Sequence, residues 1–136
     1  AGIPLTHRDH AQSCLFVTAH GRNGVLELDW DVLIRPAQTV AVYMGLQNFS
    51  ALVEGFERRG VSMDADVAII ENGTRANQRV LTGTLGDIVD KSRNAGFKSP
   101  SMIIIGSVVQ LRKQLVPTDS AAAQDPHALS IAAKTD

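Results

Sequence analysis

The chain has few of the side chains that stabilise or mark many small proteins. Its 136 residues include one cysteine, one tryptophan, one tyrosine and four phenylalanines. A single cysteine excludes a disulfide within the chain, which agrees with a reducing, cytoplasmic location. Because aromatic rings are scarce, a hydrophobic core must be built mainly from Val, Ile, Leu and Ala. The length suffices for one domain that buries roughly two-thirds of its unfolded surface.

The sequence also lacks a surplus of charge of one sign and a long apolar run. Thirteen Lys and Arg residues face fourteen Asp and Glu residues, so the formal net charge is −1. No field of the whole molecule attracts nucleic acid or a membrane surface, and we expect neither as a partner. No apolar stretch approaches the roughly 20 residues that a membrane-spanning helix needs.

What the sequence does contain is a set of three short apolar runs, each followed by a glycine-marked turn. They cover residues 40–46, 67–74 and 102–107. Each pattern predicts a buried strand that ends where the backbone is left bare. In an open α/β sheet, ligands gather at the ends of such strands.

The hydrophobic periodicity predicts a single α/β domain with about five strands in a mixed sheet and flanking helices. We expect this domain to span 1–116 and a small, polar tail to follow at 117–136. The expected strands cover 13–19, 39–44, 67–71, 78–82 and 101–105. The expected helices cover 29–34, 48–59, 85–94 and 107–115, with Asp29 and Thr84 as caps. The strand–helix–strand order over 39–71 suggests a crossover connection.

Basic and imidazole side chains gather at both ends of the first expected strand. His7, Arg8 and His10 precede it, whereas His20 and Arg22 follow it. If that strand ends near a cleft, these groups could converge on a ligand with several carboxylates, because the arginine fork pairs with carboxylate or phosphate. A solvated basic loop with a hydrogen-bonded histidine explains the same pattern, and the sequence leaves both interpretations open.

Other common site chemistries have little support. His7, His10 and His20 could form a metal-ligand set, but no acidic or cysteine residue completes it at a spacing typical of zinc, so we expect no metal. Cys14 lies in an apolar run, which favours burial over nucleophilic catalysis. The sequence contains neither a Gly-x-Ser-x-Gly elbow nor a glycine-rich phosphate loop.

Met44 is the most unusual residue at the end of an expected strand. It follows a buried run and precedes Gly45, so a soft side chain stands beside exposed backbone N–H and C=O groups. That arrangement suits an uncharged planar group such as adenine, held by main-chain hydrogen bonds. The alternative is that Met44 belongs to the core and Gly45 only turns the chain.

Five segments, in consistent order over about 1–115, resemble the carboxyl-terminal half of the tetrapyrrole methylase family. They are 1–13 (including Pro-Leu-Thr-His-Arg), 17–21 (Val-Thr-Ala-His-Gly), 38–46 (ending in Tyr-Met-Gly-Leu), 67–79 (including Glu-Asn-Gly-Thr-Arg) and 99–112 (including Met-Ile-Ile-Ile-Gly-Ser). Within the family the pattern is most similar to that of uroporphyrinogen-III C-methyltransferases. Two positions depart from it: Ala19 stands where many members have glycine, and Asp66 where a proline often precedes the strand.

The resemblance implies a fold of two α/β domains with S-adenosylmethionine bound between them. The glycine-rich cofactor loop and the residues with proton-transfer roles belong to the first domain, which this chain lacks. The implied reaction methylates two ring carbons of uroporphyrinogen III, giving precorrin-2 and S-adenosylhomocysteine, on a path to siroheme, cobalamin or haem d1. We therefore expect the chain alone to be inactive, with its own amino-terminal domain as a partner and a homodimer as the assembly.

The resemblance also assigns roles to single residues. Met44 and Gly73 correspond to cofactor contacts. The positions that it implies to contact the tetrapyrrole or to lie in the same motif are Thr6, His7, Arg8, His20 and Met44. The catalytic base is expected in the first domain. Two alternatives stay open: a related methylase that acts on another precorrin, or a non-catalytic binding or dimerisation module.

Overall fold

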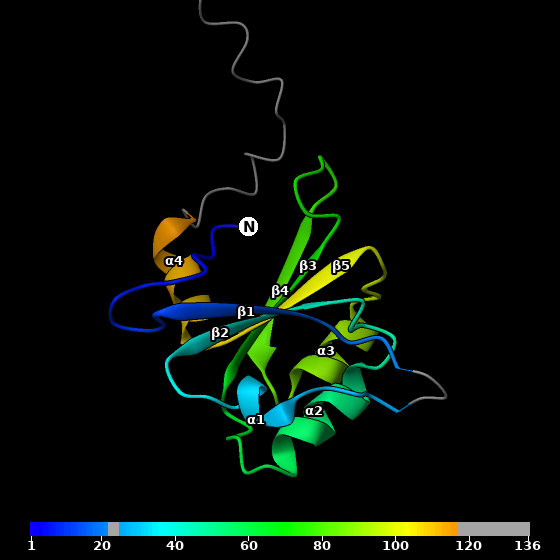
Figure 1. Cartoon of the computed structure of the whole chain (residues 1–136). Helices are drawn as coiled ribbons and strands as arrows, with labels where there is room; N and C mark the ends of the chain where they lie inside the picture. The colour runs from blue at the N-terminus through cyan, green and yellow to red at the C-terminus, as the bar shows by residue number, and fades with distance from the viewer. Residues whose placement is uncertain (22–24, 117–136) are drawn as a thin grey trace, which may run out of the picture.

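The computed structural model describes residues 1–21 and 25–116. These residues form a five-stranded mixed sheet with flanking helices (Figure 1). In chain order the strands are β1 (Ser13–Thr18), β2 (Gln38–Tyr43), β3 (Asp66–Glu71), β4 (Arg79–Thr84) and β5 (Ser101–Ile105). All of them occur close to their predicted positions, and the predicted fold class is confirmed. Arg22 and the tail expected at 117–136 lie outside the described residues.

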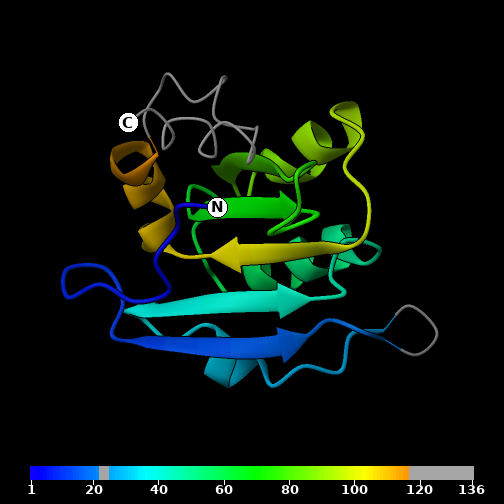
Figure 2. The same ribbon diagram turned by 90° about the horizontal axis from the view of Figure 1, so that it is seen from above.

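The order of the strands across the sheet is β1-β2-β5-β3-β4. β1 and β2 pair in parallel, β5 runs antiparallel to both β2 and β3, and β4 runs antiparallel to β3. In Figure 2, β1 (blue) and β2 (cyan) accordingly point one way and β5 (yellow) the other. The residues that follow β1, β2 and β3 therefore share one edge of the sheet, which we call the carboxyl edge. A helix joins β2 to β3, as expected of a crossover, but β5 lies between the two strands.

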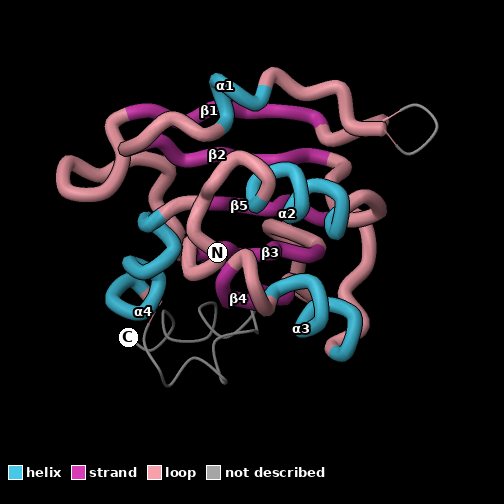
Figure 3. The backbone as a smooth tube through the Cα atoms, turned by 90° about the horizontal axis from the view of Figure 1, so that it is seen from below, coloured by secondary structure: helices cyan, strands magenta, loops and turns pink. Residues whose placement is uncertain are grey.

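Three helices cover one face of the sheet: α1 (Trp30–Leu33), α2 (Phe49–Glu57) and α3 (Ile88–Asn94) (Figures 1 and 3). Alternate strand residues point toward them, as the two-residue period of a strand requires. The core between sheet and helices includes Val40, Val42, Leu52, Phe56, Val67, Ile69, Ile88 and Ile103, none more than 3% exposed. Aliphatic side chains predominate in this core, as predicted. None of the helices in the described part of the chain is long and apolar enough to cross a membrane.

The other face of the sheet is covered only in part. The 3-10 helix η1 (Ser107–Leu111) and the amino-terminal segment pack on it through a second buried cluster: Ala11, Ala68, Ile70, Ile104, Val108 and Val109. Away from this cluster, Phe16 of β1 and Tyr43 of β2 are 52% and 43% exposed. Their rings stack with centroids 6.3 Å apart. We call the surface around these two rings the open face.

Three predicted helix boundaries or caps differ from the structure. Asp29 precedes α1 as predicted, but its side chain makes no capping hydrogen bond. Thr84 ends β4 instead of capping a helix, because the Asp87 carboxylate accepts a hydrogen bond from the Thr84 backbone N–H (2.8 Å) and α3 begins only at Ile88. The helix expected over 107–115 is divided into η1 and α4 (Arg112–Leu115).

Trp30 of α1 packs against α2 at a glycine. Its ring meets Phe56 edge to face, with centroids 5.5 Å apart, and the Arg59 guanidinium lies 4.3 Å from the ring centroid. Gly55 faces the same ring, and a Cβ atom added at Gly55 would overlap ring atoms of Trp30. The lack of a side chain at Gly55 thus decides how closely α1 approaches α2.

Candidate functional site

Met44 stands at the carboxyl edge, directly after β2, in a backbone conformation that methionine rarely adopts. Its φ is +53°, in the left-handed region, and the residue is 59% exposed. The alternative that Met44 belongs to the core is therefore wrong. A residue with a side chain pays on the order of 1 kcal/mol for this conformation, and such strain is concentrated at functional sites.

Gly45 has a packing reason to be glycine. A Cβ atom added there would lie 2.9 Å from Ile103 Cδ1 and 3.0 Å from Val42 Cγ1, both core side chains. The backbone at this point therefore rests directly on the core. Directly before Gly45, Met44 presents its side chain to solvent.

The turn after β3 is strained on both sides of Gly73. Asn72 has a φ of +50° and Thr74 a φ of +68°, both in the left-handed region. The Thr74 N–H donates to Gln78 Oε1 (2.8 Å), and the Arg75 N–H donates to the Asn72 carbonyl oxygen (3.0 Å). Gly73 itself is exposed, so its backbone is open to a ligand. We call residues 72–78 the Gly73 turn.

An ion pair closes the base of the Gly73 turn. Glu71 ends β3 and Arg79 begins β4, and the two residues are directly opposite in the strand register. Arg79 Nε donates to Glu71 Oε2 (2.5 Å), and this hydrogen bond lowers the pKa of the Glu71 carboxyl, against the burial that raises it. The backbone N–H of Lys98 donates to Glu71 Oε1 (2.7 Å) and lowers the same pKa further. The sequence analysis missed this pair, although its members bracket a glycine turn.

The predicted site residues occur at two edges of the sheet. His20, Met44 and Gly73 follow β1, β2 and β3, so the topology places all three on the carboxyl edge. The residues that instead precede β1, at the opposite edge, are Thr6, His7, Arg8 and His10. The length of β1, roughly 20 Å for six residues, separates this group from His20. The structure does not bring the two groups together.

His7 is engaged within its own loop. Its Nδ1 accepts a hydrogen bond from the Asp9 N–H (3.2 Å), and its ring meets that of His10 edge on, with centroids 5.3 Å apart. Over residues 1–21 and 25–116, no three His, Cys, Asp or Glu residues are grouped so that they could hold a metal ion. Cys14 is half-buried on the same side of β1 as Phe16, and burial raises the pKa of its thiol.

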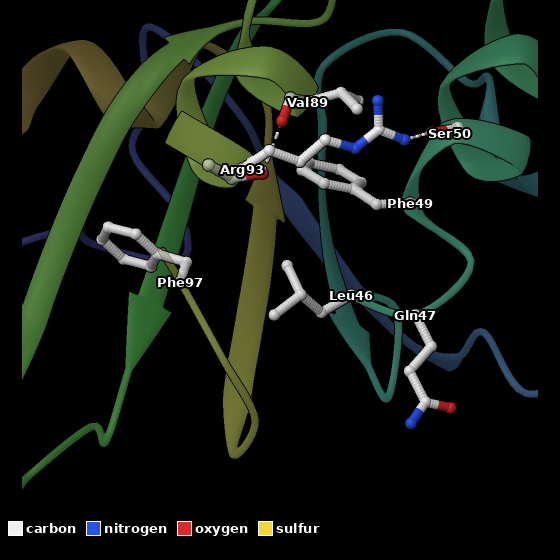
Figure 4. Close-up of a pocket in the computed structure, with 8 residues that line it drawn as sticks. Leu46, Gln47, Phe49, Ser50, Val89, Arg93 and Phe97 are labelled. Atoms are coloured by element: carbon white, nitrogen blue, oxygen red, sulfur yellow. Dashed lines mark hydrogen bonds between the residues drawn. The ribbon is translucent and has the colours of Figure 1, made fainter. Parts of the chain in front are cut away.

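A pocket of about 170 Å³ opens beside the residues that directly follow Met44 in the chain (Figure 4). It is lined by Leu46, Gln47, Phe49, Ser50, Val89, Ser92, Arg93 and Phe97. Arg93 reaches across from α3 and donates to Ser50 Oγ of α2 (2.7 Å). Ligand pockets usually measure about 300 Å³ or more, so this pocket is too small to enclose a whole ligand. No motif joins Ser50 to Arg93, which is why the sequence analysis missed both.

Residues 1–89 match the model of the family described as Tetrapyrrole (Corrin/Porphyrin) Methylases. This chain belongs to the tetrapyrrole methylase family. The siroheme synthases of Nitrosomonas europaea and Methylococcus capsulatus are 49% identical over 115 residues and 50% identical over 116 residues. Each match covers 85% of this chain and 24% of the relative, so the chain spans about a quarter of the length of these relatives.

Solved structures share the fold of this chain. A uroporphyrin-III C-methyltransferase from Thermus thermophilus is 28% identical, with a TM-score of 0.67, over 85% of this chain and 48% of that one. A structure of the enzyme from the same organism, complexed with S-adenyl homocysteine, is 23% identical, with a TM-score of 0.69 over 81% and 48%. A cobalt precorrin-4 methyltransferase, a cobalamin biosynthetic enzyme, is 24% identical, with a TM-score of 0.69 over 79% and 45%. The family predicted from sequence is confirmed.

Both departures of this chain from the family pattern have visible structural roles. Ala19 is completely buried, and its N–H donates to the Tyr43 carbonyl oxygen (2.9 Å). Asp66 is itself the first residue of β3, and its carboxylate accepts a hydrogen bond from Gln110 Nε2 (2.7 Å). Asp66 thus ties η1 to the sheet.

Proposed function

We propose that this methylase chain is the carboxyl-terminal half of an S-adenosylmethionine-dependent uroporphyrinogen-III C-methyltransferase that forms precorrin-2 by two methyl transfers. The observation that carries the proposal is that Met44 and Gly73 lie at the same edge of the sheet, the carboxyl edge. Both are exposed, and both stand in strained turns. The names of its relatives, siroheme synthase and uroporphyrin-III C-methyltransferase, support the same reaction. Its partners in this proposal are its own amino-terminal domain and a second copy of the protein.

Met44 and Gly73 are suited to hold S-adenosylmethionine. Gly73 offers backbone without a side chain, and Met44 places its backbone groups and a polarizable sulfur at the same edge. When bound, the cofactor supplies an electrophilic methyl group for in-line displacement. The chain then acts mainly by positioning, which accounts for several kcal/mol in such reactions.

Uroporphyrinogen III carries carboxylates around an apolar ring system, and the open face offers matching chemistry. Phe16 and Tyr43 form an exposed apolar surface along β1 and β2. Arg8, beside Thr6 and His7, lies beyond one end of β1, and His20 lies beyond the other. We propose that the rings of the substrate lie toward the aromatic pair and that its carboxylates reach Arg8 and His20. Because the two lie at opposite ends of a strand, each contacts a different carboxylate.

The proton that leaves the methylated ring carbon needs a base. We place that base in the amino-terminal domain and expect no turnover from this chain alone. The test is an assay with S-adenosylmethionine and uroporphyrinogen III on two proteins: the chain, and the chain preceded by the upstream part of its reading frame, here called the extended protein. A product with two added methyl groups from the extended protein alone supports the proposal. Product from the short chain, or none from a folded extended protein, contradicts it.

An Arg8→Ala variant of the extended protein separates a substrate domain from an assembly module. Loss of one charge-assisted hydrogen bond is expected to raise the KM for uroporphyrinogen III roughly tenfold, with the KM for the cofactor unchanged. Arg58→Ala is the matched control, since Arg58 directly follows α2 and pairs with Glu54 of that helix (3.2 Å). Unchanged kinetics in Arg8→Ala would favour the assembly module, and a product of different mass would favour a methylase for another precorrin.

A further inference from the structure

Glu71 is unusual in its burial. Among the residues that the structure describes, it is the one charged residue that is buried, at 6% exposed. It directly precedes the left-handed Asn72. Its partner Arg79 is 45% exposed, so only the carboxylate side of the ion pair is buried. Burying a charged group is a poor way to gain stability, because apolar replacements of the same shape are often as stable or more so. A buried carboxylate beside a strained turn calls for another explanation.

Arg79 uses its guanidinium to connect three parts of the chain. Nε donates to Glu71, while Nη1 and Nη2 donate to the carbonyl oxygens of Ala95 and Gly96, each at 3.1 Å. The guanidinium also lies 4.3 Å from the centroid of the Phe97 ring. Ala95 caps the carboxyl end of α3, where a cation is favoured by the helix dipole. One side chain therefore ties the base of the Gly73 turn to the end of α3.

The loop that follows α3 also lies beside the Met44 turn. Its Phe97 lines the pocket whose opposite side is formed by Leu46, two residues after Met44 (Figure 4). Further along, the Pro100 carbonyl oxygen accepts a hydrogen bond from the Asn72 N–H (3.0 Å). The loop over 95–100 therefore bonds to the Gly73 turn through Asn72 and shares a pocket with the residues that follow Met44.

We infer that the Glu71–Arg79 pair is a positioning device that fixes the Gly73 turn relative to Met44 and thereby sets the affinity for the nucleoside part of the cofactor. The inference rests on the proposed function, in which Met44 and Gly73 hold that cofactor. Glu71 is turned away from solvent and neutralised by Arg79, so it acts through the backbone that follows it. It is a positioning residue and touches neither ligand.

Glu71→Gln in the extended protein tests the inference, with S-adenosylhomocysteine binding measured by calorimetry. The variant keeps the shape of the side chain but removes its charge. We expect the Kd to rise about tenfold, since binding must then re-order backbone that the pair had held. The KM for uroporphyrinogen III and kcat at saturating cofactor should stay within about twofold of the wild type, a split that a general loss of folded protein would not produce. Glu54→Gln, which breaks an exposed pair on α2, is the matched control and should leave the Kd unchanged.

Each outcome bears on one conclusion. If the wild type binds S-adenosylhomocysteine and a folded Glu71→Gln variant binds it with the same Kd, the positioning role is overturned and the proposed function stays intact. A folded wild type that binds no S-adenosylhomocysteine overturns the proposed function and this inference with it. If Glu71→Gln does not fold, Arg79→Lys replaces it, because lysine keeps the charge but loses the fork to Ala95 and Gly96. Wild-type affinity in Arg79→Lys then overturns the inference.

Discussion

Gly55→Ala lowers the free energy of unfolding by about 2–3 kcal/mol, even though alanine favours a helix over glycine by about 1 kcal/mol. The new Cβ would overlap ring atoms of Trp30, so the ring has to leave its place. In doing so it loses its edge contact with Phe56 and its stacking with Arg59. Urea unfolding of the 136-residue chain, followed by circular dichroism, measures the loss.

A double-mutant cycle identifies the cause of that loss. Once Trp30→Ala has removed the ring, Gly55→Ala should stabilise the chain by about 1 kcal/mol, because only the helix preference remains. The sign of the Gly55 effect thus depends on Trp30. Equal losses in both backgrounds would mean that the overlap with the ring is not what makes glycine necessary.

Arg79→Ala is expected to cause the second largest loss, a fall in Tm of about 5–10 °C at neutral pH. It leaves the buried carboxylate of Glu71 with the Lys98 N–H alone and frees the carbonyl oxygens of Ala95 and Gly96. Although Arg79 is itself 45% exposed, Glu71 is buried, and leaving a buried charge without its partner costs more than breaking an exposed pair. Arg58→Ala, which breaks an exposed pair on α2, should therefore shift Tm by no more than about 2 °C.

The loss in Arg79→Ala should depend on pH. The pKa of Glu71 is lowered in the folded protein, chiefly by the hydrogen bond from Arg79. Its ionisation therefore contributes stability above the pKa of an unfolded glutamate, about 4.3, and that contribution disappears as the pH falls through the lowered folded pKa. The difference in Tm between wild type and Arg79→Ala should be largest near neutral pH and shrink in acid. A difference that stays constant into acid would show that packing on Phe97, and not charge, is what Arg79 supplies.

Local sequence patterns predicted the strands well and their arrangement poorly. The apolar runs at 67–71 and 101–105 predicted buried strands, because burial on both faces of a strand removes polar positions. Nothing in those runs says that β5 pairs with both β2 and β3, since pairing depends on contacts distant in sequence. The cap expected at Thr84 was wrong for a local reason: the Asp87 carboxylate bonds backward to Thr84 and delays the helix.

The two turns of the candidate site, at Met44 and at Gly73, were predictable from the sequence, because each follows an apolar run and contains a glycine. The topology places both turns at one edge of the sheet. The exposure of Met44 was not predictable, because an apolar residue after a buried run has the same pattern whether it points inward or outward. Spacing already placed Arg8 and His20 at opposite ends of the first expected strand, and the extended β1 keeps them roughly 20 Å apart instead of letting them converge. Glu71 and Arg79 meet only because the hairpin register sets them opposite each other.

The position of β5 has a consequence for biosynthesis. The strand at the centre of the sheet is the last of the five to leave the ribosome. Until residue 105 has emerged, β1–β2 and β3–β4 are separate ribbons, each with an unpaired edge that could join another nascent chain. Loop-closure entropy opposes this late insertion, so the domain should fold slowly for its size and depend on β5 to complete it. A nascent chain stalled before Ser101 is thus the form of this protein most exposed to aggregation.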